Sequence, residues 1–212
     1  MQRIKVLMVD DHEILRDGLK RILAEDESFA VMAEAGTVDE ALSHLRQMPI
    51  DVVLLDISLP GRSGLDLLRA IGTLEPRPAV LVLSMYAENQ YAMRALKYGA
   101  DGYLTKKSAG RLLVEAMHKV AAGGKYVSPA LAEQLALNVV KPVAPTRESS
   151  LSAREFEVLR AIAGGRSLTS IAEDLHLSVK TIGTYRSRIL GKTGLSSNAA
   201  LTRYALQEGL ID

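Results

Sequence analysis

The strongest constraint on the fold of this chain is a regular alternation, over residues 1–124, of short apolar runs with longer amphipathic patterns. The apolar runs cover 4–9, 29–35, 51–56, 79–84 and 102–105. The amphipathic patterns have helical spacing and lie near 13–24, 38–48, 64–74, 89–98 and 109–122. The third and fourth runs are almost entirely apolar, as expected of parallel strands with helices on both faces. The pattern predicts an α/β fold, a doubly wound parallel sheet of five βα units.

Some of these helices carry start signals. Thr37 with Glu40 has the spacing of a capping box, in which each side chain accepts a hydrogen bond from the backbone of the other. Ser108 is expected to cap the fifth helix. Asp11, just before the first helix, is a further capping candidate.

A break in the pattern separates a second, helical part of the chain. After a short helix predicted from Ser128-Pro129 to about Leu137, the segment 141–150 (KPVAPTRESS) has two prolines and no periodicity. Four helical patterns follow at 152–163, 168–175, 179–192 and 197–208. We therefore expect a first domain over 1–124, a linker with a short helix over 125–150, and a small all-α domain over 151–212.

The composition excludes several classes of protein. The 212 residues contain no cysteine, which excludes disulfides, thiolate catalysis and Cys-based zinc sites and favours a reducing cytoplasm. No apolar run approaches the length of a membrane span, and the run at 4–9 is too short for a signal peptide. Neither a GxGxxG nor a Walker A sequence follows any predicted strand, which argues against nucleotide binding. We expect a soluble, cytoplasmic protein.

Acidic residues stand at the ends of two predicted strands. Asp10-Asp11 follows the first apolar run, and Asp56 ends the third. In a five-stranded parallel sheet of order 2-1-3-4-5, strands 1 and 3 are neighbours, and ligands bind beyond their carboxyl ends. Three carboxylates brought together there repel one another unless a hard divalent cation such as Mg²⁺ neutralises them. The sequence therefore predicts a Mg²⁺ site at this edge of the sheet.

A hydroxyl and an ammonium group are expected at the same edge. Ser84 ends the fourth run and Lys106 follows the fifth, and a donor and a cation at such a site suit a phosphoryl group. No His, Cys or Ser is placed with an obvious base, so the candidate nucleophile is the carboxylate of Asp56. Three of the residues at this edge also have a purely structural interpretation. Asp11 could cap the first helix, Ser84 could be a strand-end hydroxyl, and Lys106 could be a solvated charge.

At these residues the first domain resembles the receiver domain of bacterial two-component response regulators, which has a flavodoxin-like fold. The resemblance covers residues 3–124. It rests on Asp10-Asp11, Asp56 with the following ISLPG segment, Ser84, and the GADGYLTK run that ends in Lys106. The resemblance implies that a histidine kinase phosphorylates Asp56. It also implies that Mg²⁺ is held by Asp10, Asp11, Asp56 and the backbone carbonyl of Ser58.

The same resemblance assigns Ser84 and Tyr103 to a switch, in which the hydroxyl moves toward the phosphoryl group and the ring turns inward. Without the resemblance, Tyr103 is interpreted as a packed aromatic side chain of a short strand. Gly61 and Gly64 are interpreted as turn formers without a chemical role. One departure is Lys106-Lys107, where many receivers have Lys-Pro, and it leaves the peptide geometry after Lys106 open.

The second and third helices of the C-terminal domain have the spacing of a helix-turn-helix, whose second helix enters the major groove of DNA. The polar side chains of this second helix are Lys180, Thr181, Thr184, Arg186, Ser187, Arg188 and Lys192. Lys180, Thr184 and Arg188 are the candidates for base edges, and Arg186 and Lys192 for phosphates. With no Trp and two Phe, the chain lacks an aromatic platform for single strands, so double-stranded DNA is favoured. The alternative is a solvated basic face of a helical interaction domain.

Residues 151–195 resemble the LuxR-type domain of the NarL/FixJ response regulators. The matching residues are Leu151-Ser152, Arg154-Glu155, Ile171-Ala172, and Ser178 through Thr181-Ile182. The chain departs from the family pattern at Leu168-Thr169-Ser170, Gly183 and Tyr185, where a common phosphate anchor is missing. Gly183 is expected to weaken its helix by up to about 1 kcal/mol relative to alanine and to permit close approach to the DNA backbone.

Together the two resemblances imply a phosphorylation-dependent transcription factor and not an enzyme. The implied partners are a sensor histidine kinase, double-stranded promoter DNA, a second copy of the chain and RNA polymerase, with no membrane partner. One alternative is a phosphorylation-independent dimeric transcription factor, in which the receiver-like domain only dimerises. A phosphatase of the aspartyl-phosphate kind is disfavoured, because those enzymes resemble one another in a second Asp two residues after the nucleophile, where this chain has Ser58.

Overall fold

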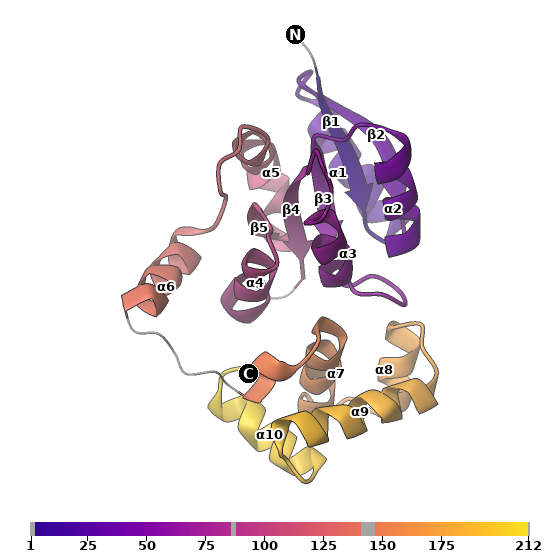
Figure 1. The fold of residues 1–212 in the computed structure, drawn as a ribbon, viewed down its shortest axis with the longest axis vertical. Coiled ribbons are helices and arrows are strands. Elements are labelled where there is room, and N and C mark those ends of the chain that lie inside the picture. The colour runs from indigo at the N-terminus through magenta and orange to yellow at the C-terminus, as the bar shows by residue number, and fades with distance from the viewer. Residues whose placement is uncertain (1–2, 86–87, 141–146, 212) are drawn as a thin grey trace. The chain divides into compact units, whose positions relative to one another are not determined.

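The computed structural model describes residues 3–85, 88–140 and 147–211. The chain divides into two compact units, Met1–Val140 and Lys141–Asp212 (Figure 1). The first unit contains the whole sheet, and the second contains only helices among its described residues. No helix in the described part of the chain is long and apolar enough to cross a membrane.

The first unit is built on a parallel sheet of five strands in the order β2-β1-β3-β4-β5. The strands are β1 (Ile4–Val9), β2 (Phe29–Ala35), β3 (Val52–Asp56), β4 (Ala79–Ser84) and β5 (Gly102–Thr105). All of β3 is buried, and so is β4 except for its first residue, which accounts for their apolar sequences. The doubly wound α/β fold and its strand order are as predicted, with β1 and β3 adjacent.

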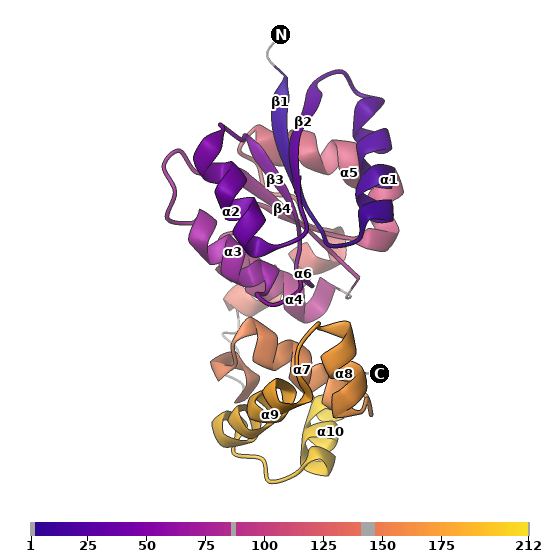
Figure 2. The same cartoon turned by 90° about the vertical axis from the view of Figure 1, so that its right-hand side faces the viewer.

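Five helices alternate with the strands. They are α1 (Glu13–Ala24), α2 (Val38–Gln47), α3 (Gly64–Ile71), α4 (Glu88–Lys97) and α5 (Lys106–Ala121). α1 and α5 pack together on one face of the sheet, and α2 and α3 pack together on the other (Figure 2). Beneath α1 and α5, the strand residues Met8, Leu54 and Leu83 meet Leu113 and Met117 in one apolar cluster. The apolar faces of strands and helices thus hold the carboxyl ends of β1 and β3 in place.

One predicted helix start and one predicted capping box differ in the structure. α5 begins at Lys106, with Thr105 and not Ser108 in the N-cap position. The Ser108 hydroxyl lies 2.9 Å from that of Thr105, inside the first turn. At α2 the Thr37 hydroxyl accepts a hydrogen bond from the Glu40 amide, but the Glu40 carboxylate accepts from the Gly36 amide, so only half of the expected capping box forms.

Residues 125–140, which the sequence assigned to the linker, group with the first unit. Tyr126 forms a parallel bridge with Gly102, where the Tyr103 amide donates to the Tyr126 carbonyl at 2.9 Å. A Cβ on Gly102 would lie 3.0 Å from that carbonyl oxygen, so the close pairing depends on glycine. The following helix, α6 (Pro129–Val140), contacts α4. The chain beyond α5 is therefore attached to the edge of the sheet at β5.

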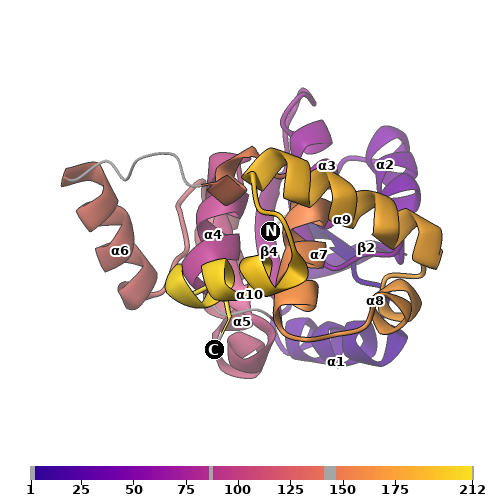
Figure 3. The ribbon, with the colours of Figure 1, turned by 90° about the horizontal axis from the view of Figure 1, so that it is seen from below.

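The described residues of the second unit form four α-helices after a short 3₁₀ turn, η1 (Arg147–Ser150) (Figure 3). The helices are α7 (Ala153–Ala163), α8 (Leu168–Asp174), α9 (Val179–Thr193) and α10 (Asn198–Gln207). Each begins after a serine whose hydroxyl accepts a backbone N–H of the first turn. The buried residues Phe156, Ile171, Ile182, Ile189 and Leu201 come from all four helices, so α9 is fixed on one side by a shared core.

Candidate functional site

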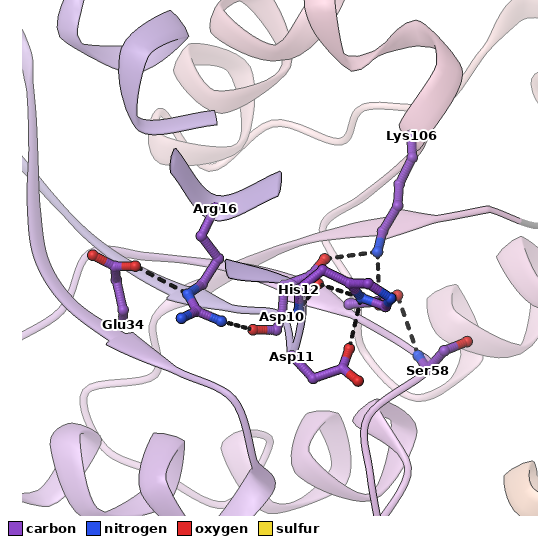
Figure 4. Close-up of polar contacts among 8 residues, drawn as sticks. Asp10, Asp11, His12, Arg16, Glu34, Ser58 and Lys106 are labelled. Atoms are coloured by element: carbon purple, nitrogen blue, oxygen red, sulfur yellow. Dashed lines mark hydrogen bonds and ion pairs between the residues drawn. The ribbon is translucent and has the colours of Figure 1, made fainter. Parts of the chain in front are cut away.

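Four side chains with potential metal-binding atoms meet at the carboxyl edge of the sheet (Figure 4). Asp10 directly follows β1, and Asp56 is the last residue of β3. Their neighbours Asp11 and His12 complete the group, and one ligand atom from each of the four lies within 4.8 Å of the others. Asp10 and Asp56 are 3% and 2% exposed. The structure thus brings together the three carboxylates that the sequence selected.

Lys106 contacts this group from the start of α5. Its Nζ lies 2.6 Å from Asp10 Oδ2 and 2.7 Å from Asp56 Oδ2, and its side chain is 6% exposed. The contact with Asp56 is a hydrogen bond, and the contact with Asp10 is an ion pair. Lys106 is therefore a buried partner of the carboxylates, and the alternative of a solvated charge is wrong.

The pKa values in this pocket reflect burial and the shortage of positive charge. Burial raises the pKa of Asp56, the ammonium group of Lys106 opposes this rise, and the charge of Asp10 adds to it. Burial alone would lower the pKa of Lys106, but Asp56 and Asp10 outweigh it and the pKa is raised. Lys106 therefore stays protonated, while a charged Asp56 is held in an environment that disfavours its charge.

Two buried carboxylate oxygens lack a hydrogen bond to any described residue, namely Asp10 Oδ2 and Asp11 Oδ1. Each has one charged or polar neighbour, Lys106 Nζ at 2.6 Å from Asp10 Oδ2 and His12 Nδ1 at 2.9 Å from Asp11 Oδ1. An ionised carboxylate oxygen accepts more than one partner, and hard oxygen ligands are the ones that Mg²⁺ and Ca²⁺ take in proteins. Ser58, two residues after Asp56, lies beside it and donates its amide to Asp56 Oδ1 at 3.2 Å. The acidic pocket is therefore suited to a hard divalent cation.

Sequence reasoning did not select His12. Its Nδ1 lies 3.1 Å from Asp10 Oδ1 and 2.9 Å from Asp11 Oδ1, with the side chain 66% exposed. His12 also occupies the N-cap position of α1, without a side-chain cap, so the capping role considered for Asp11 is wrong. The signal in the sequence was the position of His12 directly after the acidic pair.

Gly64 contributes more than the turn that the sequence assigned to it. A Cβ at this position would lie 2.1 Å from the carbonyl oxygen of Asp56 and 2.9 Å from the Cα of Ile57. The Gly64 amide donates to the Ile57 carbonyl at 2.9 Å. The first turn of α3 thus packs directly on the backbone of Asp56, and only glycine leaves room for that approach.

Ser84 and Tyr103 lie on the adjacent strands β4 and β5. Tyr103 pairs with Val82, and Ser84, two residues further along β4, pairs with Thr105. Both side chains are fully buried. A core-packing role and a switch role both remain compatible with this position of Tyr103.

The exposed side of α9 carries most of the selected DNA-binding residues. Lys180, Thr184, Ser187 and Arg188 are exposed and fall on one face, while Thr181 and Arg186 are half-buried. The opposite face holds the buried residues Ile182 and Ile189. With other described residues, the side chains of Lys180 and Arg188 form neither hydrogen bonds nor ion pairs. The row selected for base edges is therefore on the accessible side of the helix.

Several of the other selected residues have partners within the second unit. Lys192 Nζ donates to Glu155 Oε2 at 2.6 Å, and this carboxylate is 4% exposed. Arg186 Nε donates to Asn198 Oδ1 at 2.6 Å. The hydroxyls of Thr184 and Ser187 donate to carbonyls one turn earlier in α9, and that of Thr181 lies 2.8 Å from the Ser178 hydroxyl. Lys192 in particular stabilises the fold of the domain.

Comparison of this sequence with known proteins identifies the family to which the chain belongs. Residues 6–118 match the response regulator receiver domain, and residues 149–205 match the bacterial regulatory proteins of the luxR family. The chain is 37% identical to the response regulator GacA of Pseudomonas aeruginosa, with 99% of this chain and 98% of the relative covered. It is 35% identical to the response regulator UvrY of Escherichia coli, with 99% and 96% covered. The chain therefore belongs to the response regulators that join a receiver domain to a LuxR-type DNA-binding domain.

Solved structures of similar proteins agree with this assignment. RcsB of Salmonella enterica serovar Typhimurium, bound to a promoter in the presence of the phosphomimetic BeF₃⁻, has a TM-score of 0.60 at 26% identity, with 96% of this chain and 98% of that chain covered. The response regulator ChrA of a heme-sensing two-component system has a TM-score of 0.54 at 33% identity, with both chains fully covered. The protein is a phosphorylation-dependent transcription regulator of a two-component system, as the sequence predicted.

Proposed function

We propose that Asp56 is the phosphoacceptor of this regulator. The supporting observation is its place at the end of β3, buried, with Lys106 Nζ 2.7 Å from Oδ2 and the acidic pair beside it. In transfer from a sensor histidine kinase, a carboxylate oxygen of Asp56 bonds to phosphorus as the bond from phosphorus to the imidazole nitrogen breaks. The product is an aspartyl phosphate, whose charge Lys106 partly neutralises.

The proposed cation is Mg²⁺, held by the carboxylates of Asp10, Asp11 and Asp56 and by the backbone carbonyl of Ser58. The buried oxygens of Asp10 and Asp11 that lack hydrogen bonds support this choice. When bound, the ion supplies further neutralisation of charge during phosphoryl transfer. We assign the response to Ser84 and Tyr103, with the hydroxyl moving toward the phosphoryl group and the ring changing its packing.

For DNA, the proposed contacts are made by α9 in the major groove of a double-stranded promoter. Lys180, Thr184 and Arg188 are assigned to base edges, because their row is exposed. Arg186 and Lys192 are assigned to phosphates, and Thr181 and Ser187 complete the DNA-binding set. Lys192 also pairs with Glu155 inside the domain. The regions assigned to this function are 1–124 for the receiver, 125–150 for the linker, of which 125–140 group with the first unit, and 151–212 for DNA binding.

The chain acts in this proposal as a cytoplasmic homodimer, formed on phosphorylation or on DNA, with RNA polymerase as a further partner. Its proposed role is regulation of transcription and not catalytic turnover of a phosphate ester. Phosphatases with an aspartyl-phosphate intermediate resemble one another in an Asp two residues after the nucleophile, and this chain has Ser58 there.

Phosphate incorporation from acetyl phosphate tests the acceptor. Wild type is expected to gain one phosphoryl group in the presence of Mg²⁺, detected by intact mass and lost after alkaline or hydroxylamine treatment, which cleaves acyl phosphates. Asp56→Asn is expected to gain none. Asp39→Asn serves as the matched control, because it makes the same change at a carboxylate that is 81% exposed and lies outside the acidic pocket. Incorporation into Asp56→Asn at the wild-type rate would show that the acceptor is another residue.

A further inference from the structure

The side chain of Arg16, outside the acidic pocket, contacts the backbone of the pocket residue Asp10. Arg16 lies in α1 with its side chain 16% exposed, and it extends over the carboxyl end of β1 (Figure 4). Its Nη1 donates a hydrogen bond to the backbone carbonyl of Asp10. Its Nε donates to Glu34 Oε2 on β2 at 2.9 Å. Arg16 therefore ties the residue after β1 to the neighbouring edge strand.

The carbonyl of Asp10 lies between the two acidic residues of the pocket. It belongs to the planar peptide unit that joins Asp10 to Asp11, so fixing this oxygen restricts the backbone from which both carboxylate side chains extend. The sheet holds only the other side of Asp10, where its amide donates to the Ala35 carbonyl at 3.0 Å. The regular pairing of β1 with β3 ends at Val9. Arg16 thus supplies a hydrogen bond at the point where the strand ladder stops.

Glu34 holds the guanidinium group in place. Its second oxygen, Oε1, accepts from Lys20 Nζ at 2.7 Å, and Lys20 also pairs with Asp17 at 2.8 Å. Hydrogen bonding by Lys20 is the main cause that lowers the pKa of Glu34, although burial opposes it. The carboxylate therefore stays charged and offsets the charge of Arg16, which would otherwise repel a cation at the nearby pocket.

We propose that Arg16, held by Glu34, is a positioning residue of the cation site, which presets the carboxylates of Asp10 and Asp11 for the divalent ion. This inference depends on the proposed function of the pocket. Partners of metal ligands commonly change metal affinity by about 10- to 100-fold when they are removed. Because Arg16 acts through a peptide group and touches no ligand atom, we expect an effect near the lower end of that range.

Direct binding of Mn²⁺, a paramagnetic substitute for Mg²⁺, tests the proposal by electron paramagnetic resonance. Arg16→Gln is expected to weaken Mn²⁺ binding roughly 10-fold. Arg16→Lys keeps one donor group and is expected to lose less. Glu34→Gln keeps the shape of its side chain, removes the charge that orients Arg16, and is expected to weaken binding as well. Arg21→Gln, an exposed change on the same helix, is the matched control and should bind as wild type does.

A second readout separates positioning from a merely structural role. The Mg²⁺ concentration for half-maximal phosphate incorporation should rise in Arg16→Gln, with a smaller change in the maximal rate, and thermal unfolding without metal shows whether the variant is folded. Mn²⁺ affinity within twofold of wild type in folded Arg16→Lys and Glu34→Gln would overturn the proposal, even if Arg16→Gln failed to fold. If wild type itself bound no Mn²⁺, or bound it as well after Asp10→Asn, the assignment of the pocket would fail instead.

Discussion

One ammonium group faces three carboxylates at the carboxyl edge of the sheet, so the pocket is short of positive charge. Lys106 pairs with Asp10 and Asp56, while the partner of Asp11 is the imidazole of His12. Burial, opposed by Lys106, raises the pKa of Asp56. The pocket is therefore suited to a divalent cation, whose charge would offset the excess of negative charge.

Gly64 is expected to matter for both folding and phosphorylation. In Gly64→Ala the new Cβ must move away from the Asp56 carbonyl, which lies 2.1 Å from its ideal position. We predict a loss of about 1–3 kcal/mol in the free energy of unfolding, measured with urea, and slower phosphate incorporation into the folded fraction. Gly110→Ala is the control, since a Cβ there meets nothing within 4 Å. Equal behaviour of the two variants would contradict this account.

Asp26 provides a pH-dependent contribution far from the phosphoacceptor. Hydrogen bonds from Ser28 and His118 lower its pKa to about 2, and its Oδ2 lies 2.7 Å from His118 Nε2. A carboxyl group with a lowered pKa stabilises the fold above its unfolded value of about 3.9, and this stabilisation is lost as the pH falls through the folded value. Asp26→Asn should therefore lower the free energy of unfolding near neutral pH, and the difference from wild type should shrink as the pH falls toward 2.

Urea unfolding of both proteins across this range measures that difference. A difference that stays constant from neutral to acidic pH would show that the charge of Asp26 does not contribute. The carboxyl carbon of Asp26, followed by NMR, should titrate with a midpoint near 2.

Helix α9 separates two tasks between its faces. The exposed row with Lys180 and Arg188 is available to DNA, whereas Lys192 pairs with the nearly buried carboxylate of Glu155. Burial alone would raise the pKa of Glu155, but Lys192 and the backbone of Ser152 outweigh it and the pKa is lowered. One basic helix therefore carries residues for DNA binding and a residue for its own attachment to α7.

A matched pair of alanine variants distinguishes these tasks. Arg188→Ala should weaken specific DNA binding by about 1–3 kcal/mol without changing the free energy of unfolding. Lys192→Ala should lower the free energy of unfolding by about 1–3 kcal/mol, because Glu155 loses its charged partner. Fluorescence anisotropy with labelled DNA and urea unfolding measure the two quantities. A large loss of stability in Arg188→Ala, or none in Lys192→Ala, would contradict the division.

The elements themselves were largely predictable from sequence. Every strand and nearly every helix follows from apolar periodicity, since a covered parallel sheet requires it. The start of α5 was missed because Lys106, Lys107 and Ser108 show no apolar spacing. The bridge at Tyr126 was missed because a single pair of residues leaves no periodic signal.

The candidate site was predictable only in part. Strand ends located Asp10, Asp11 and Asp56, because parallel strands share one carboxyl edge. The contacts of Arg16 with Glu34 and with the Asp10 carbonyl depend on side-chain direction across two elements, and periodicity carries no such information. The same holds for the contact of Lys192 with Glu155, which neither charge nor spacing in the sequence indicated.

At the level of the whole molecule, the chain combines a phosphoryl-accepting unit with a DNA-binding unit. Phosphorylation needs to change their coupling by only about 1–3 kcal/mol to control DNA binding. A promoter of two half-sites about one helical turn apart would then be read by two copies of α9.

Mobility shift on promoter fragments tests this coupling most directly. Wild type and Asp56→Asn are compared with and without beryllofluoride and Mg²⁺, with the exposed-site variant Asp39→Asn as the control. We predict that beryllofluoride tightens DNA binding by wild type and by the control, and leaves Asp56→Asn unchanged. Equal binding by wild type and Asp56→Asn under both conditions would contradict the account and would make the receiver a phosphorylation-independent dimerisation unit.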